Sequence, residues 1–211
     1  MNEQQIQEKL AGMKKTRKTL QTVTTIVAIL SMIMLIVYNF LPVTYLKSSL
    51  ANQSASAANF SEGFAFPGWQ MIFWGCGGQF IMQDNLFDPN PITIIGCVGT
   101  LLVLIICTIL YKRGKNTSKA VKEFIMAACL IYSALVLGAF ITSVSAMAAT
   151  SGGVYNFKYD YLLAETSTYT AAMGAYLALV VCGISAIVKI INGAFLLKQK
   201  SFAKKYAPKK K

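Results

Sequence analysis

The sequence predicts an all-α membrane protein, a four-transmembrane-helix bundle with a long first extracellular loop that carries a short aromatic and glycine-rich interfacial element. Three observations predict this fold. The 211 residues are 55% apolar and only 13% charged, whereas a soluble domain is about 25% charged. The apolar residues gather in four long runs. The 20 Lys and Arg residues lie almost entirely outside those runs, on one side of the predicted membrane.

Each apolar run is long enough to cross a bilayer as a helix, which takes about 20 residues. The runs cover residues 20–41, 91–111, 124–147 and 169–197, and the last includes an amphipathic extension beyond Val188. None holds Asp, Glu, Lys or Arg in its middle. The first run could be a signal peptide, but its nearest small-residue cleavage candidate, 54–58, lies well past the apolar core. An uncleaved anchor is therefore the favoured interpretation.

The distribution of basic residues predicts the orientation. Residues 1–19 carry five, residues 112–123 carry five, and the segment from Lys189 to Lys211 carries eight. The loops 42–90 and 148–168 carry one each, Lys47 and Lys158. A bias of 18 against 2 predicts a multi-pass protein of the plasma membrane with both termini in the cytoplasm.

The basic tail, residues 198–211, is predicted to be too polar to pack against a core. Its lysines either only enforce the topology or also contact anionic lipids at the cytoplasmic face of the bilayer. The candidate lipid contacts are Lys198, Lys200, Lys204, Lys205, Lys209, Lys210 and Lys211.

The first outer loop has two parts. Residues 46–63 are rich in Ser, Ala and Asn, which is typical of a flexible linker or a loosely ordered hairpin. Residues 64–81 are dense in aromatics and glycine, and Pro67 is placed to open a short helix that carries Trp69, Ile72 and Phe73. These aromatics form either an aromatic belt with a small extracellular core or a docking surface for a partner. The candidate interface residues are Phe66, Trp69, Phe73, Trp74 and Phe80.

Small residues mark the last two spans. Gly138 lies in the third, and Gly174, Ala178 and Gly183 lie in the fourth. Small side chains let the backbones of membrane helices approach closely. We expect these positions to serve helix packing, within one chain or between copies in a homo-oligomer.

The layout resembles that of claudin-type tetraspan proteins, which also have four spans and a long first outer loop with a Trp–Gly–Cys region. Here Trp69, Trp74, Gly75 and Cys76 match part of that family's W…GLW…C…C signature, but the leucine and the second cysteine are missing. We therefore do not expect this chain to have the barrier or pore function of claudin-type proteins. The segment from Pro67 to Phe73 is similar to a segment of small four-helix membrane proteins of Gram-positive bacteria, a resemblance that implies no activity.

The sequence offers little for catalysis or metal binding. The chain has no His, the commonest general base and a common metal ligand. Asp84 and Asp88 supply too few oxygens for a calcium cage. Cys76, the only cysteine outside the spans, has no partner for a bridge within its loop, although an intermolecular bond between two copies is open to it. No enzyme activity, cofactor, metal or nucleic-acid partner is expected.

Two functions remain. The first is a non-catalytic structural or interaction protein, acting as an accessory subunit of a membrane complex or as a homo-oligomer, with the outer aromatic loop as docking surface. The alternative is an oligomeric channel or small-solute transporter. Transporters usually carry charged residues or broken helices at mid-membrane, and the predicted spans show neither clearly.

Overall fold

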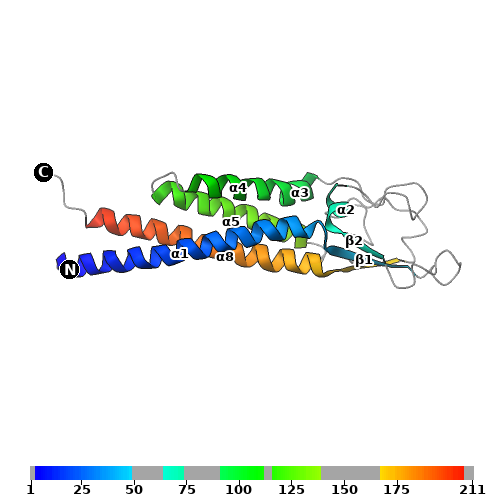
Figure 1. Cartoon of the computed structure of the whole chain (residues 1–211), viewed down its shortest axis with the longest axis horizontal. Coiled ribbons are helices and arrows are strands. Elements are labelled where there is room, and N and C mark those ends of the chain that lie inside the picture. Colours follow the sequence, from blue (N-terminus) through cyan, green and yellow to red (C-terminus); the bar gives the residue numbers. More distant parts are fainter. Residues whose placement is uncertain (1–2, 49–63, 74–90, 112–115, 139–166, 207–211) are drawn as a thin grey trace.

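The fold is an elongated bundle of four long helices with a small sheet at one end (Figure 1). The structure, a computed structural model, describes residues 3–48, 64–73, 91–111, 116–138 and 167–206. Four helices in it are long and apolar enough to cross a membrane: Gln4–Tyr38, Ile92–Tyr111, Thr117–Gly138 and Met173–Lys205. This confirms the prediction of a multi-pass membrane protein with four spanning helices.

Two of these helices are much longer than the bilayer requires. Helix α1 (Glu3–Tyr38) and helix α8 (Met173–Lys205) extend about 54 and 50 Å at 1.5 Å per residue, whereas the hydrocarbon core is about 30 Å thick. Both project beyond the other pair at the end where the chain termini lie, which we call the terminal end (Figure 1). The opposite end is called the sheet end.

The basic tail is partly helical, which corrects the expectation that it does not pack. Helix α8 continues to Lys205. Gln199 is buried, and the ammonium of Lys9 on α1 lies 5.3 Å from the ring centroid of Phe202. The first part of the tail therefore packs against α1, because one face of its helix carries these less polar side chains.

The second span is one helix with a wider turn inside it. It consists of α3 (Pro91–Ile94), the π-helical turn η3 (Ile95–Gly99) and α4 (Thr100–Tyr111). A π turn disturbs the regular backbone ladder, and the hydroxyl of Ser133 on the neighbouring helix donates to the carbonyl of Gly96 within it. The Ser133 hydroxyl thus stabilises the irregular turn.

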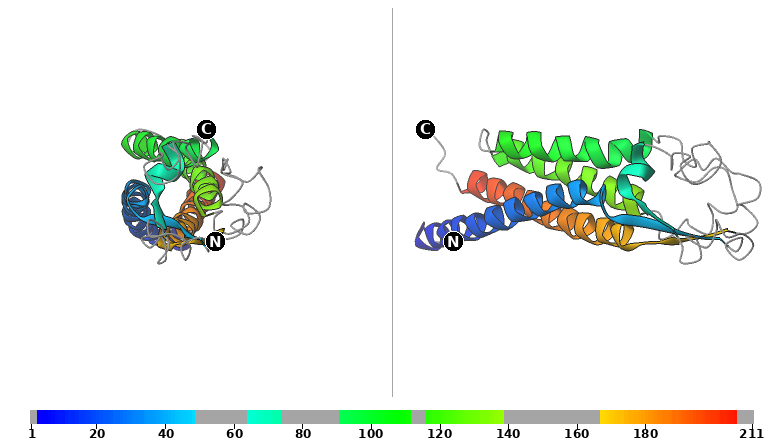
Figure 2. Two further views of the ribbon diagram at one scale, coloured as in Figure 1. Left: turned by 90° about the vertical axis from the view of Figure 1, so that its right-hand side faces the viewer. Right: turned by 45° about the vertical axis from the view of Figure 1, so that its right-hand side comes forward.

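Helix α5 (Asn116–Gly138) packs closely along α8 (Figure 2). A Cβ at Gly138 would lie 2.9 Å from Cβ of Leu179, and one at Gly193 would lie 3.0 Å from the ring of Phe124. Glycine at these two positions therefore lets α5 and α8 approach more closely than larger residues would allow. The apolar core beside them includes Leu130 and Leu137.

A three-stranded antiparallel sheet lies at the sheet end in the described part of the chain. Strand β1 (Pro42–Ser48) is central, between β2 (Phe64–Pro67) and β3 (Ser167–Ala171). Tyr45 pairs with Ala65 on one side and with Thr170 on the other. Antiparallel pairing of β1 and β2 agrees with the hairpin interpretation, but residues 49–63 lie outside the described residues. Strand β3 was not predicted. Its first two residues belong to the predicted second outer loop, 148–168, and residues 169–171 were expected to begin the fourth span, whose helix starts only at Met173.

The short helix predicted after Pro67 is present as α2 (Gly68–Phe73). It sits on the end of α1: the amide of Trp69 donates to the carbonyl of Asn39 at 3.0 Å, and that of Gly68 donates to the carbonyl of Leu41 at 3.1 Å. A Cβ at Gly68 would lie 2.2 Å from the carbonyl oxygen of Tyr38. Only glycine fits this contact.

Candidate functional site

The main polar feature of the bundle is an ion pair buried between α5 and α8. Glu123 lies about 22 Å along α5 from Gly138, and Lys189 lies about 24 Å along α8 from Met173. The two antiparallel helices therefore bring these side chains to the same level. The Glu123 Oε2 to Lys189 Nζ distance is 3.2 Å, and the residues are only 1% and 2% exposed.

Asn192 extends the ion pair into a network that joins all four helices. It lies one turn beyond Lys189 on the same face of α8. Its Nδ2 lies 2.8 Å from Glu123 Oε1, 3.2 Å from the hydroxyl of Tyr111 on α4 and 3.4 Å from Oγ1 of Thr24 on α1. We call Thr24, Tyr111, Glu123, Lys189 and Asn192 the polar cluster.

A pocket of about 120 Å³ opens beside the polar cluster. All four long helices line it, and its lining residues are Thr24, Thr25, Ala28, Thr108, Tyr111, Glu123, Met126 and Lys189. The lining combines one carboxylate and one ammonium with hydroxyl groups. The pocket can therefore both donate and accept hydrogen bonds.

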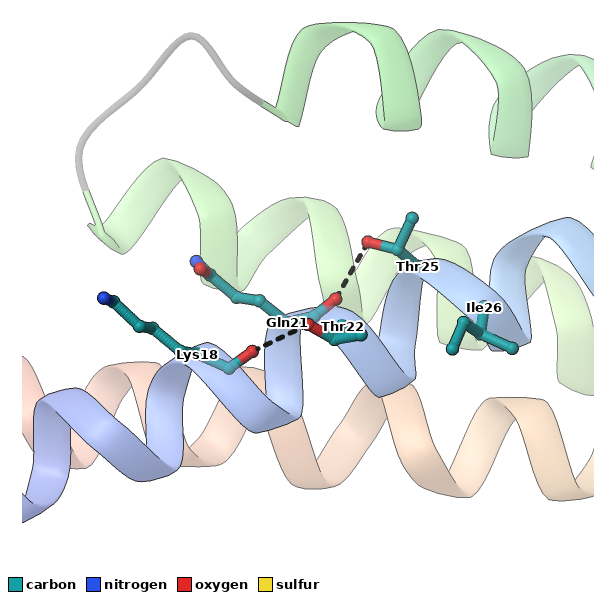
Figure 3. Close-up of a pocket in the computed structure, with 5 residues that line it drawn as sticks. All are labelled: Lys18, Gln21, Thr22, Thr25 and Ile26. Carbon is teal, nitrogen blue, oxygen red and sulfur yellow. Dashed lines mark hydrogen bonds between the residues drawn. The ribbon is translucent and has the colours of Figure 1, made fainter.

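A wider pocket, of about 490 Å³, lies along α1 toward the terminal end. It is lined by Lys18, Gln21, Thr22, Thr25 and Ile26 (Figure 3). The hydroxyls of Thr22 and Thr25 donate to the backbone carbonyls of Lys18 and Gln21. Because Thr25 lines both pockets, they adjoin each other on the α1 side of the polar cluster.

Two buried acceptor atoms of the polar cluster receive no hydrogen bond from the described residues: Glu123 Oε2 and Asn192 Oδ1. Buried polar groups in native proteins almost always have a partner, either protein or ordered water. Glu123 Oε2 has the ammonium of Lys189 beside it but still has room for a further donor. The polar cluster thus has unused hydrogen-bonding capacity.

The sequence pattern did not predict this site. Glu123 falls in the predicted loop 112–123, and Lys189 falls in the amphipathic extension of the fourth run, where it was counted with the basic C-terminal segment. No ionisable residue was expected in the middle of a span. The structure contradicts this, because both lie within membrane-length helices and are buried. One signal was present: Lys189 stands between Val188 and Ile190, and a single charge with apolar neighbours on both sides is expensive to place against lipid.

The candidate interface aromatics are only partly described. Trp69 lies on α2 and is 42% exposed. Phe66 belongs to β2, and Phe73 is the last residue of α2. Trp74 and Phe80, together with Asp84, Asp88 and Cys76, lie outside the described residues. A docking surface made of the five aromatics therefore stays a prediction.

The candidate packing residues differ from one another. A Cβ at Gly174 would lie 2.9 Å from the carbonyl oxygen of Pro42, and Ala178 is buried. Gly138 faces Leu179, as described above. A Cβ at Gly183 would meet no atom within 4 Å. Close approach within the chain therefore occurs at Gly138 and Gly174 but not at Gly183.

Four of the seven candidate lipid-contacting lysines lie within the described part of the chain. Lys198, Lys200, Lys204 and Lys205 are exposed on the last turns of α8. Lys209, Lys210 and Lys211 lie outside the described residues.

Potential metal ligands and thiols are scattered in the described part of the chain. No group of three or more His, Cys, Asp or Glu side chains there could hold a metal ion. Cys97, Cys107, Cys129 and Cys182 are free thiols. The polar cluster brings together a carboxylate, an ammonium, an amide and two hydroxyl groups, and it is the candidate functional site.

Comparison with known proteins adds no family to this picture. No family model matches the chain, and no curated protein or solved structure matches it. The claudin-type proteins and the small four-helix membrane proteins noted above share a layout of four spanning helices. The structure supports that layout, with four long apolar helices.

Proposed function

We propose that this chain is a non-catalytic membrane scaffold or accessory subunit whose sheet end docks a partner outside the cell. In this proposal both termini are cytoplasmic and the protein resides in the plasma membrane, in line with a distribution of basic residues of 17 to 2 once the buried Lys189 is left out. The exposed lysines at the end of α8 would then face anionic lipids of the inner leaflet. The protein would act as a homo-oligomer or as part of a larger complex.

The observation that carries the proposal is the position of β1. This strand follows α1 after three residues and pairs with both β2 and β3, while β3 leads almost directly into α8. The amide of Ala172 donates to the carbonyl of Val43 at 2.8 Å. Strands from both outer loops are therefore joined in one sheet that is attached to two long helices, which provides a rigid support for a binding surface.

Packing at the sheet end also favours a scaffold. Leu35, Tyr38, Ile72, Leu137 and Ala175 are all buried there with at most 1% exposure. The Tyr38 hydroxyl donates to the carbonyl of Leu137 at 3.3 Å. A filled, hydrogen-bonded core fits a closed bundle better than a water-filled pore through a single chain.

The test is capture of partners from native membranes with the full-length chain. Replacing Trp69 and Trp74 by Ala should reduce the recovery of a specific partner, because both lie in or next to α2 on the proposed docking surface. Ile109→Ala serves as the control, since Ile109 is 68% exposed on α4 and far from the sheet. Equal recovery with both tryptophans replaced would contradict the docking proposal.

A second candidate, an oligomeric channel or small-solute transporter, is favoured by one observation. Buried charges in membrane helices often mark solute or ion pathways, and Glu123 and Lys189 line a pocket shared by all four helices. Flux of small solutes into liposomes that contain the purified protein tests it. Selective flux that Glu123→Gln abolishes would support the transporter; the absence of flux would leave the scaffold as the function.

A further inference from the structure

We propose that the pocket beside the polar cluster binds a small zwitterionic solute, of the size of glycine or alanine. The ligand's ammonium group would meet Glu123, and its carboxylate would meet Lys189. This proposal deepens the second candidate function by naming the solute class. It requires binding only, so it can hold whether or not the chain moves the solute across the membrane.

Charge balance selects the ligand class. The described pocket contributes one carboxylate, Glu123, and one ammonium, Lys189, and their charges cancel. A bound anion or cation would leave a net charge among membrane helices, which is strongly unfavourable. A zwitterion keeps the site neutral and presents each charge to its opposite. Among polar solutes it is therefore the best match to a carboxylate and an ammonium placed 3.2 Å apart.

Hydrogen-bonding capacity points the same way. Glu123 lines the pocket, and its Oε2 atom is buried, lies 3.2 Å from Lys189 Nζ, and receives no hydrogen bond from the described residues. An ammonium supplies three donors and would satisfy it. The ligand's carboxylate would accept from Lys189 Nζ and from the hydroxyl of Thr108, which also lines the pocket.

The pocket's size limits the ligand. Its volume is about 120 Å³, somewhat less than a cavity of about 150 Å³ that holds the six carbon atoms of benzene. A solute of about five or six non-hydrogen atoms fills that space, which admits glycine or alanine but not an amino acid with a large side chain. Met126 and Ala28 form the apolar part of the lining.

A polar surface leads to the pocket from the terminal end. Lys18, Gln21 and Thr25 follow one another at helical spacing along α1, and Figure 3 shows them lining the wider pocket. Polar side chains at i, i+3 and i+7 lie on one face of a helix. Thr25, which is exposed, is the residue at which this surface meets the inner pocket.

The test is calorimetric titration of the full-length protein in nanodiscs with glycine, alanine, leucine, acetate, methylammonium and glycerol. We expect saturable binding of glycine or alanine and none of the other four. Glu123→Gln and Lys189→Met should each weaken binding about tenfold or more, because each removes one charged hydrogen-bond partner. Ser185→Ala is the matched control: Ser185 is buried on α8 and bonds to Ser31 at 2.8 Å, away from the pocket.

A second variant keeps the test decisive if those two proteins fail to fold. Thr25→Leu changes an exposed side chain at the pocket's mouth, so the bundle should stay intact while glycine binding falls. Heat signals for none of the ligands would show a pocket that holds only water and would overturn the proposal. So would equal binding of acetate and glycine, or glycine binding that survives Glu123→Gln and Thr25→Leu. Binding without liposome flux would refute the transporter and leave the zwitterion site standing.

Discussion

Glu123 on α5 and Lys189 on α8 place their charged atoms 3.2 Å apart in the interior of the bundle, where both residues are almost fully buried. Removing water from two charges is costly, and the cost is offset only when they are paired and hydrogen-bonded. Asn192 supplies such a hydrogen bond to Glu123 at 2.8 Å. The pair thus ties α5 to α8 and sets which turns of the two helices face each other.

Removing one partner of this pair should destabilise the bundle far more than removing both. Lys189→Met leaves the Glu123 carboxylate buried without its counter-charge, which costs about 3–5 kcal/mol. The double variant Glu123→Leu, Lys189→Met should recover most of that loss, because an apolar pair leaves no unpaired charge. Thermal unfolding of the purified protein in detergent measures both effects.

Lys198→Met is the control for that experiment, since Lys198 is exposed on the same helix. It should leave the unfolding temperature nearly unchanged. If the double variant is as unstable as the single ones, the ion pair is not what makes the single changes harmful.

Gly68→Ala should disrupt the contact between α2 and α1. The added Cβ would lie 2.2 Å from the carbonyl oxygen of Tyr38, so the short helix must move or the backbone must deform. We expect a loss of roughly 1–3 kcal/mol and faster proteolysis of the segment that follows Pro67. Gly183→Ala is the matched control, because its Cβ would meet no atom within 4 Å. Similar protease sensitivity of the two variants would contradict this packing.

Pairing of β1 with β3 can be tested by cross-linking. Tyr45 and Thr170 are direct Cα partners, and directly opposed residues of an antiparallel pair have Cβ atoms about 4.5–5.5 Å apart. With Cys76 replaced by Ser, the variant Tyr45→Cys, Thr170→Cys should form a disulfide under mild oxidation, detectable by mass spectrometry after digestion. Tyr45→Cys with Thr168→Cys is the off-register control, since Thr168 pairs with Lys47. A stronger bond in the control would mean that the register differs.

The proposed orientation gives a further prediction. A fluorescent protein fused after Lys211 should fold and fluoresce in the cytoplasm, because 17 of the 20 basic residues, all but Lys47, Lys158 and the buried Lys189, lie on the side assigned to the termini. Alkaline phosphatase inserted between residues 49 and 63 should be active, since that enzyme needs an extracytoplasmic location to form its disulfides. The reverse pattern would refute cytoplasmic termini.

The number and type of the long helices follow from sequence alone. A run of about 20 apolar residues has few alternatives in a bilayer, since only a helix satisfies its own backbone there. The short helix after Pro67 is equally local: proline favours the start of a helix, and Gly68 permits the close approach to Tyr38. Such features depend on neighbouring residues, so the linear pattern was enough to predict them.

Only the tertiary structure revealed the sheet and the polar cluster. Thr44 pairs with Ala171 across most of the chain, and no local pattern states which distant strands meet. Glu123 and Lys189 each stand near the end of an apolar run, where a charge can reach water. Their burial depends on the position of α5 relative to α8 along the bundle axis and on which face of each helix points into the bundle. Those are properties of packing between helices, and the physical reason is that a charge is buried only when the fold supplies its partner.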